Sequence, residues 1–556
     1  MRCGGYGKRC AVSGILTRFA PRLLSWPQML FRLVVASALL FYGCGHSPGG
    51  AAADAPIVTS SDAPALDAAR DAPPDGAPDA AADAGAAPTI TAGAADRFLL
   101  TGMIVTPDTA FAGQVLVEGN AITCADVSCA AMPGAAGATL IDTQGVIAPG
   151  LIDTHNHILF DIFDDSDWLP AQVYQDHDQW TSEPKYQAML DVKQCLVDDS
   201  QGKPAWCAST PYGSAAGSLR CEVDKYGELK GLIAGTTSIV GLPGTSGACF
   251  GSLARSIDVA QNELGSDTMQ TSALYPPSDP SSVCANFASG KTTAYLVHAG
   301  EGDDAKAQAE FAALGAMTTP ANCLYAPQTA ITHGVAFTAD NFATMATAGM
   351  KLIWSPQSNV SLYNTTADIP TARAAGVTIA IAPDWSMGGS QNLLDELRFG
   401  DAWDDAHWGD ILAPKDLVAM ATTSAAHVVA RDAQLGRLAP GYLADLAVYA
   451  GDPSQPYAAI LAAHPKDVRL VMVDGVVLYG DSALALAGPA QPGCEAIDIC
   501  GASKFLCVAT TSTANKLDQT FAQIQAALVQ GLADADAATP SDGFNFSPLA
   551  PLSSCN

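Results

Sequence analysis

The sequence has few basic residues and no long hydrophobic run beyond its N-terminal segment. Outside that segment, no stretch reaches the ~18 uninterrupted apolar residues of a membrane-spanning helix, which argues against an integral membrane protein. Only 27 Lys and Arg stand against 56 Asp and Glu, so the formal net charge is −29. A negative field of this kind repels phosphate backbones, and we therefore expect no nucleic-acid partner.

The remaining composition is that of a folded protein. The chain has 556 residues, and 49% of them are hydrophobic, which excludes a wholly disordered chain and a small disulfide-only scaffold. This length corresponds to about three or four domains of ordinary size, although one α/β barrel alone can take up about 250 residues or more.

Residues 1–44 are predicted to be a targeting segment. A short basic start at Met29–Arg32 precedes an apolar run from Leu33 to Tyr42, which is too short to span a bilayer as a helix. The run ends at Gly43-Cys44 and resembles a bacterial lipoprotein signal, in which the cysteine is lipidated and becomes the first residue. We predict a lipidated Cys44 and an exported protein that contacts a membrane only through this lipid; a plain secretory signal cleaved nearby is the alternative.

Residues 45–95 are predicted to be a disordered tether. The segment consists largely of Ala, Asp and Pro and has almost no large apolar side chains. It cannot bury enough surface to offset the conformational entropy of ordering the chain. Such a tether would hold a folded body away from the membrane to which Cys44 is anchored.

Cysteine usage fits export to an oxidising compartment. Of the 15 cysteines, Cys3, Cys10 and Cys44 lie in the N-terminal segment, which leaves an even number, 12. No pair has zinc-finger spacing, so disulfides are the better interpretation. We expect local bridges within four groups: Cys124 and Cys129; Cys195, Cys207 and Cys221; Cys249, Cys284 and Cys323; and Cys494, Cys500, Cys507 and Cys555.

The ordered body is predicted to be α/β. Short strand-like runs occur at residues 96–148 and again at 433–485, with an Asp-Gly turn in the second piece, so we expect one small β domain built from both flanks. Between them, residues 149–432 alternate apolar strand-like runs with helical stretches, and this length suits eight βα units in a closed (β/α)8 barrel. Residues 486–556 form a cysteine-bearing, partly helical C-terminal extension, with helical periodicity over 515–537. Barrel strand four is expected between Tyr275 and Gly290.

Histidine and aspartate recur at the ends of the predicted strands. His155 and His157 follow an apolar strand and are separated by one residue, so in an extended chain both imidazoles point the same way and can meet one ion. His298 and His333 end two further strands 35 residues apart, the length of one βα unit, and Asp384 ends another. The active sites of α/β barrels lie at these strand ends.

These motifs together resemble the metal-dependent amidohydrolase superfamily, in particular the mononuclear branch that contains cytosine deaminase, triazine hydrolases and adenosyl-type deaminases. The resemblance covers roughly residues 96–480. It rests on Pro149-Gly-Leu-Ile-Asp-Thr-His-Asn-His157, His298-Ala-Gly-Glu301, Thr332-His333, Ser355-Pro-Gln-Ser-Asn359, Asp384 and Gly436-Arg-Leu-Ala-Pro-Gly-Tyr-Leu-Ala-Asp-Leu446. It implies a (β/α)8 barrel with a composite β-sandwich formed by both flanks.

The resemblance also implies a site. One divalent metal ion, zinc or alternatively iron or manganese, would be bound by His155, His157, His298 and Asp384. Such an ion activates water for attack on a small-molecule substrate. Glu301 matches the proton-shuttling glutamate, His333 matches the histidine beside the activated water, and Asp384 would also accept a proton.

Other residues are assigned more peripheral places. Asn359 and Trp385 are predicted to line the substrate pocket, and the long segment from Asp161 to Arg220 to form a lid or substrate wall. His427 is expected to be a structural residue in a helix. Three further histidines are expected in loops or on the surface: His177, His407 and His464. Among these, His407 is the only pocket candidate.

Three functions remain open from the sequence. The first is a hydrolytic deaminase, or a related hydrolase, acting on a C–N bond of a nitrogen heterocycle. The second is a cyclic-amide or amide hydrolase similar to imidazolonepropionase, and the third is a surface lipoprotein that binds without catalysis. The complete set of metal-binding residues together with Glu301 argues against the third, and release of ammonia distinguishes the first from the second.

Overall fold

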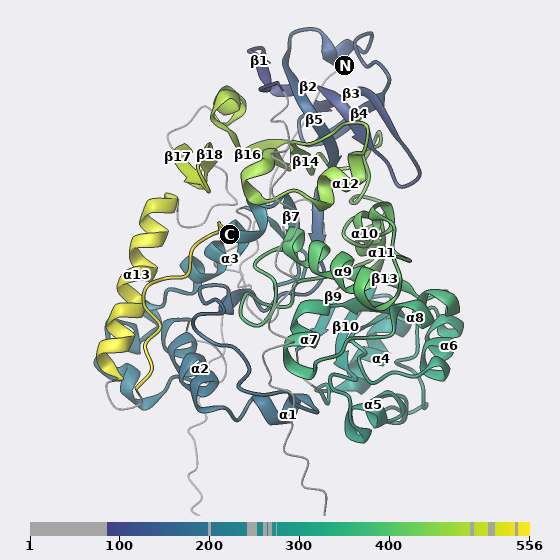
Figure 1. Cartoon of the computed structure of the whole chain (residues 1–556), viewed down its shortest axis with the longest axis vertical. Helices are drawn as coiled ribbons and strands as arrows, with labels where there is room; N and C mark the ends of the chain where they lie inside the picture. Colours follow the sequence, from purple (N-terminus) through teal and green to yellow (C-terminus); the bar gives the residue numbers. More distant parts are fainter. Residues whose placement is uncertain are drawn as a thin grey trace, which may run out of the picture. The chain divides into compact units, whose positions relative to one another are not determined.

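The computed structural model describes a large part of the chain as an α/β protein (Figure 1). The described residues are 86–197, 202–241, 253–258, 264, 269–273, 275–489, 494–509, 518–539 and 543–555. The predicted targeting segment with Cys44 and the predicted tether up to residue 85 lie outside them. The described strands form one ten-stranded sheet and two parallel sheets of five and three strands.

The ten-stranded sheet contains β1 (Thr89–Thr91), β2 (Ala94–Val105), β3 (Ala110–Glu118), β4 (Ala121–Asp126), β5 (Ala138–Pro149), β14 (Leu446–Tyr449), β15 (Val468–Val473), β16 (Val476–Asp481), β17 (Cys494–Ile499) and β18 (Ala502–Cys507). The parallel sheets contain β6 (Leu151–Asp153), β7 (Thr236–Ile239), β8 (Arg255–Ser256), β9 (Met269–Ser272), β10 (Ala294–Ala299), β11 (Thr329–His333), β12 (Lys351–Trp354) and β13 (Thr378–Ile381).

The α-helices are α1 (His177–Trp180), α2 (Pro184–Val197), α3 (Arg220–Leu232), α4 (Pro280–Ser289), α5 (Ala305–Ala316), α6 (Ala339–Ala348), α7 (Pro356–Tyr363), α8 (Ile369–Ala375), α9 (Leu393–His407), α10 (Pro414–Met420), α11 (Thr423–Val428), α12 (Pro456–Leu461) and α13 (Phe521–Ala538). In the C-terminal extension, α13 packs against α2 and α3, as the predicted helical periodicity requires. Its buried face includes Ile524, Leu528 and Leu532.

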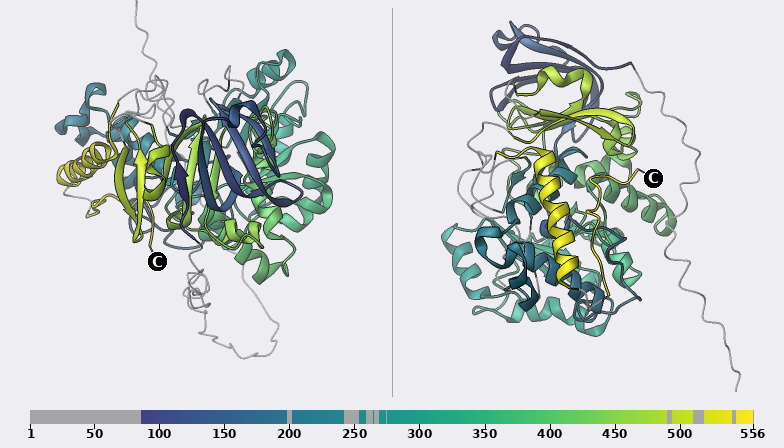
Figure 2. Two further views of the ribbon diagram at one scale, coloured as in Figure 1. Left: turned by 90° about the horizontal axis from the view of Figure 1, so that it is seen from above. Right: turned by 90° about the vertical axis from the view of Figure 1, so that its left-hand side faces the viewer.

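Strands from both flanks of the chain pair in the ten-stranded sheet, as the sequence predicts. The strand order is β17-β18-β16-β15-β14-β5-β2-β3-β4, and the two flanks meet where β14 pairs antiparallel with β5. In Figure 2, the N-terminal strands and the C-terminal strands lie side by side in this sheet. The Asp474-Gly475 turn joins β15 to β16, as expected from its sequence.

Two boundaries differ from the prediction. Thr89–Thr91, assigned to the tether, forms β1 and pairs with β5, because backbone hydrogen bonds to an existing strand order a segment that buries little side-chain surface. In the C-terminal extension, β17 and β18 form a hairpin whose second strand pairs with β16, so the sheet continues beyond residue 485.

The parallel strands follow chain order in two groups, β6-β7-β8 and β9-β10-β11-β12-β13. The ends of β6 and β13 meet through a parallel bridge between Asn156 and Asp384. Strand four was predicted in the wrong place: it is β9, whereas α4 occupies most of the interval from Tyr275 to Gly290. The reason is local, because Asp279 caps α4 by accepting from the Ser282 amide, and Pro280 suits the first helical position.

A buried ion cluster connects a parallel strand to the ten-stranded sheet. Arg255, in β8, is fully buried and lies 2.6 Å from Asp445 Oδ2 through Nε and 2.9 Å from Asp445 Oδ1 through Nη2. Its Nη2 also lies 2.7 Å from Asp474 Oδ1 in the β15–β16 turn. A bidentate pair fixes orientation as well as distance, so this cluster sets how the two sheets meet.

We expect Asp445→Ala to lower the free energy of unfolding by about 3–5 kcal/mol, because it leaves the Arg255 guanidinium buried without its main partner. Denaturant unfolding of the folded variant measures this loss. Asp474→Ala is the matched control and should cost clearly less, since the side chain of Asp474 is 34% exposed while that of Asp445 is 4% exposed. Equal losses in the two variants would contradict the expectation.

Disulfides within the predicted groups are confirmed. They join Cys124 to Cys129, Cys195 to Cys207, Cys284 to Cys323, Cys494 to Cys507 and Cys500 to Cys555. Each pairs cysteines from one of the four groups, as expected for local bridges. Stable bridges of this number are typical of proteins that fold in an oxidising compartment.

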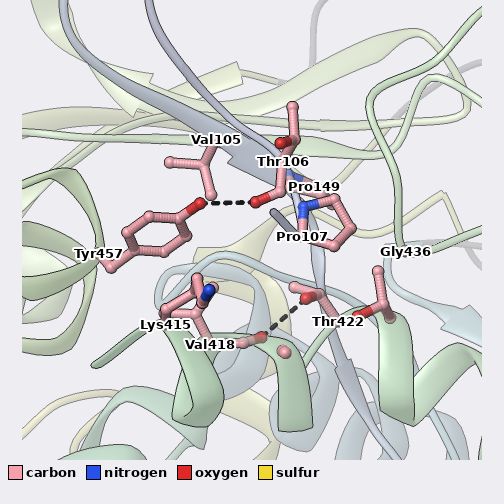
Figure 3. A pocket seen from close by; sticks show the side chains of 11 residues that line it. Val105, Thr106, Pro107, Pro149, Lys415, Val418, Thr422, Gly436 and Tyr457 are labelled. Atoms are coloured by element: carbon pink, nitrogen blue, oxygen red, sulfur yellow. Dashed lines mark hydrogen bonds between the residues drawn. The ribbon is translucent and has the colours of Figure 1, made fainter. Parts of the chain in front are cut away.

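The contact between the ten-stranded sheet and the neighbouring helices leaves a small cavity of about 10 Å³ (Figure 3). It is lined by residues of β2, α10 and the start of α12, and Tyr457 closes one side by donating a hydrogen bond of 2.7 Å to the Thr106 carbonyl. This volume holds about one water molecule, so it is too small for a substrate. Across the part of the chain that the structure describes, no helix is both long and apolar enough to cross a bilayer.

Candidate functional site

The paired histidines follow β6, a strand that is buried throughout. Asp153, the last residue of β6, accepts hydrogen bonds of 3.0 Å from the His155 amide and from Asn156 Nδ2, which orders the following turn. The His157 amide donates to the Asp384 carbonyl at 2.6 Å, and the Asp384 amide donates to the His155 carbonyl at 3.1 Å. The first and last parallel strands are therefore joined at the residues whose side chains carry the chemistry.

The Asp384 carboxylate lies between the two imidazoles. Its Oδ1 is 2.9 Å from His155 Nε2 and 3.4 Å from His157 Nε2. Burial raises the pKa of Asp384, and His157 and His298 partly oppose that shift. A carboxylate with several imidazoles around it is a donor set typical of a divalent metal site.

His298 joins this group from the end of β10. Its Nδ1 donates a hydrogen bond of 2.8 Å to the Ser272 carbonyl at the end of β9. Because a carbonyl oxygen only accepts, Nδ1 carries the hydrogen and Nε2 keeps its lone pair. That Nε2 is buried without a hydrogen-bond partner, and the His298 ring centroid is 4.7 Å from that of His155 and 5.6 Å from that of His157.

The residues fit a metal ion. Ligand atoms of His155, His157 and His298 all lie within 4.8 Å of one another, and so do those of His155, His333 and Asp384. Burial lowers the pKa of His155, His157 and His298 to about 3, which keeps these imidazoles neutral as metal binding requires. The unpartnered His298 Nε2 is the atom that such an ion would satisfy.

His333 ends β11 beside these histidines. Its ring centroid is 5.1 Å from that of His298, and the Asn359 amide donates to His333 Nδ1 at 2.9 Å. Since Nδ1 accepts, Nε2 carries the hydrogen and faces Glu301, whose Oε2 is 3.9 Å away. Burial and the neighbouring histidines hold the pKa of His333 well below its usual value, so it acts as a neutral donor.

Asn359, predicted to line the substrate pocket, contacts His333 in the structure. It is fully buried on α7, and its side chain bonds to His333 and to Thr366. Its position in the first turn of a helix directly after β12 places the amide behind the histidine. Its contribution is therefore to orient His333.

Glu301 follows His298 by three residues, and its carboxylate lies beside His333. Tyr363 donates a hydrogen bond of 2.8 Å to Glu301 Oε1, and Trp180 Nε1 donates to Tyr363 at 3.0 Å. Burial raises the pKa of Glu301 to about 7, with His177 opposing the shift. A carboxyl group with such a pKa can both take up and release a proton near neutral pH.

An aromatic wall covers the site on the side of His157. Trp385 lies 5.6 Å from His157 between ring centroids and is itself packed against rings of the first crossover segment and the turn after His157. The members of this wall are Phe160, Trp168, Trp180, Tyr186 and Trp385. Three of them come from residues 161–220, the segment predicted to form a lid or substrate wall.

The surface prediction for His177 is wrong, whereas His407 lies on the surface as expected. His177 is buried, with Nε2 2.9 Å from Glu310 Oε1, whereas His407 is exposed on α9 and stacks on Trp403. Burial lowers the pKa of His177, but the Glu310 hydrogen bond and the charges of Glu301 and Glu310 outweigh it and raise the pKa. His427 lies on α11 as expected.

Tyr363, Trp180 and Glu310 were not identified from the sequence. None of them belongs to a spacing pattern of the kind that the site histidines follow. Each lies on a helix, and the sequence does not show which face of that helix turns toward the site. Only the hydrogen bonds of the folded protein connect them to Glu301.

Comparison with known proteins agrees with this geometry. Residues 251–478 match the Amidohydrolase family. The chain is 26% identical over 441 residues to 5-methylthioadenosine/S-adenosylhomocysteine deaminase of Symbiobacterium thermophilum, which covers 69% of this chain and 94% of that protein. It is also 28% identical over 166 residues to 8-oxoguanine deaminase of Pseudomonas aeruginosa, and this match covers 28% of this chain and 37% of that protein.

The structure is similar to that of atrazine chlorohydrolase from Arthrobacter aurescens TC1, solved in complex with zinc. The TM-score is 0.51 at 17% sequence identity, and the match covers 71% of this chain and 97% of that one. At this identity the similarity concerns the fold.

Fold and site together define an α/β protein with a buried centre suited to a divalent metal. The family match over residues 251–478 and the similarity to deaminases support a hydrolase of the metal-dependent amidohydrolase superfamily that acts on carbon–nitrogen bonds. The resemblance drawn from the sequence motifs is thereby confirmed.

Proposed function

We propose that the protein is a zinc-dependent hydrolytic deaminase that replaces an amino group on a nitrogen heterocycle with oxygen from water, releasing ammonia. The observation that carries the proposal is the gathering of His155, His157, His298 and Asp384 beside Glu301, whose pKa is about 7 and whose carboxylate faces His333. Two similar proteins named as deaminases support the reaction type.

Each polar residue of the site has a defined part in this reaction. A divalent ion held by His155, His157, His298 and Asp384 would supply Lewis acidity toward a water molecule. Asp384 accepts a proton from the attacking water, and Glu301 carries a proton to the ring nitrogen or to the departing amine. His333 donates from Nε2 toward the attacked centre. Tyr363 holds Glu301 through the 2.8 Å hydrogen bond.

The proposal is tested with zinc-loaded protein and three substrate classes: heterocyclic amines, lactams and N-acyl amino acids. Release of ammonia from a heterocyclic amine, absent in Glu301→Gln, supports the deaminase. Turnover confined to lactams or N-acyl amino acids, without release of ammonia, would instead establish the cyclic-amide or amide hydrolase.

We further propose that the two parallel sheets close into one (β/α)8 barrel over residues 149–432. The chain order of the strands, the bridge from Asn156 to Asp384 and the similarity to the solved structure of atrazine chlorohydrolase support closure. Residues 96–148 and 433–485 would form the accompanying composite β-sandwich, for which the shared sheet of β5 and β14 is the support.

We propose that the protein is exported and anchored through a lipid on Cys44. The apolar run before this residue and the five disulfides whose cysteines both lie among the described residues support the proposal. Expressed in a bacterium with a lipoprotein pathway, the parent should sediment with membranes and yield an N-terminal peptide with a diacylglyceryl mass. Cys44→Ser should remove both properties. A parent that is released without a lipid mass would contradict the anchor and leave export intact.

A further inference from the structure

We propose that His177 and Glu310 act as a positioning pair that holds the backbone of Glu301 in place for proton transfer. The two side chains lie outside the metal site, on α1 and α5, and bond to each other at 2.9 Å. Both are buried, with 7% and 4% of their surfaces exposed, so the bond is made away from water.

The pair contacts the backbone on both sides of the Glu301 side chain. Glu310 Oε2 accepts a hydrogen bond of 2.7 Å from the Gly300 amide, directly before Glu301. The His177 amide donates to the Glu301 carbonyl at 3.2 Å. Together with the bond between His177 Nε2 and Glu310 Oε1, these contacts form a closed ring of hydrogen bonds through β10, α5 and α1.

The local backbone needs such support. Glu301 stands between Gly300 and Gly302, whose φ angles of +69° and +144° lie in regions that glycine adopts readily and that other residues rarely adopt. A Cβ on Gly300 would lie 2.4 Å from the Phe337 ring, and one on Gly302 would lie 2.3 Å from the Gln175 carbonyl oxygen. Tight packing therefore demands glycine on both sides of Glu301, and glycine adds conformational freedom where the catalytic carboxylate must be fixed.

The single turn of α1 reaches Glu301 at two points. Its first residue, His177, bonds to the backbone, and its last residue, Trp180, donates to the Tyr363 hydroxyl that holds the Glu301 carboxylate. The turn is continuous with the segment that supplies Trp168 and Tyr186 to the aromatic wall. The pair thus ties the position of the proton shuttle to the wall against which a substrate ring would lie.

The kinetic test rests on the proposed function and uses the zinc-loaded full chain. We expect Glu310→Ala and His177→Phe each to lower kcat by about 10²-fold with KM within about threefold of the parent, because displacement of a reacting group acts on the chemical step. Metal content should equal that of the parent. The double variant should be little worse than either single variant, as expected for two residues that act as a unit. Glu310→Gln should recover most of the rate, since its amide oxygen can still accept from the Gly300 amide.

Lys306→Ala is the matched control. Lys306 is on the same helix as Glu310 and contacts the same α1 segment, but through partly exposed ion pairs with Asp176 and Asp178. Exposed ion pairs contribute little to stability, so we expect kcat close to that of the parent. Parent-like kcat in both Glu310→Ala and His177→Phe, or a loss accompanied by loss of metal, would overturn the proposal.

Hydrogen exchange tests the same pair without any substrate. Protection of the Gly300 amide should fall in Glu310→Ala and stay unchanged in Lys306→Ala, because only the former loses the acceptor of that amide. This readout holds even if no substrate is turned over by the parent, so failure of the deaminase proposal is distinguishable from failure of the positioning proposal. If Glu310→Ala does not fold, Glu310→Asp, whose shorter side chain draws the carboxylate away from the Gly300 amide, replaces it in this measurement. Unchanged exchange at Gly300 in the folded Glu310 variant would overturn the proposal.

Discussion

Glu301→Gln is expected to lower kcat by about 10²–10⁴-fold, the usual effect of removing a general acid–base group. Glutamine keeps the size of the side chain and can still accept the hydrogen bond from Tyr363, but it cannot carry a proton. Steady-state kinetics on a substrate that the parent converts measures the loss. Metal content should stay at the parent level, because Glu301 is not among the residues whose ligand atoms cluster in the site.

The companion variant is Tyr363→Phe. It leaves the carboxyl group intact and removes only the hydroxyl that holds it, so we expect a smaller loss than in Glu301→Gln. Should Glu301→Gln keep most of its activity on a verified substrate, the shuttle must be His333 or Asp384. A fall in activity that parallels loss of metal would likewise refute the assignment, because it would make Glu301 part of the metal site.

The double variant His155→Ala/His157→Ala is expected to lose the metal and all measurable turnover. The parent should contain about one tightly bound divalent ion per chain, since a site with three imidazoles and one carboxylate leaves room for a water as a further ligand. Elemental analysis after dialysis against a weak chelator measures both proteins. Thermal unfolding should show a stabilisation by added zinc in the parent and none in the variant, because a ligand stabilises only the state that binds it.

His427→Ala is the matched control for this pair. His427 is exposed on α11, with 52% of its side-chain surface accessible, and it pairs only with Asp432 on the surface. Its metal content and activity should equal those of the parent. Two equivalents of metal in the parent, or unchanged metal in the double variant, would contradict a single ion bound by the paired histidines.

The sequence by itself pointed to the residues that the structure brings together in the candidate metal site. His155 and His157 follow a strand as alternate residues, and His298, His333 and Asp384 each end a strand or lie just beyond one. Parallel strands in chain order bring their carboxyl ends to one edge, so residues far apart in the sequence become neighbours through secondary structure alone. The same reasoning predicted that both flanks contribute to one sheet, because β-type alternation is visible in each piece.

Only the tertiary structure decided how these residues are held. Asn359 lies behind His333, and His177 and Glu310 bond around Glu301, because helix packing brings these side chains together. No sequence spacing records such contacts, since each depends on which face of a helix turns inward. The place of β9 was equally hidden, because a strand of four residues carries too little periodicity to be recognised, and the helix start at Asp279 was missed. Residue type and strand position identify a site, whereas packing selects which neighbours orient it.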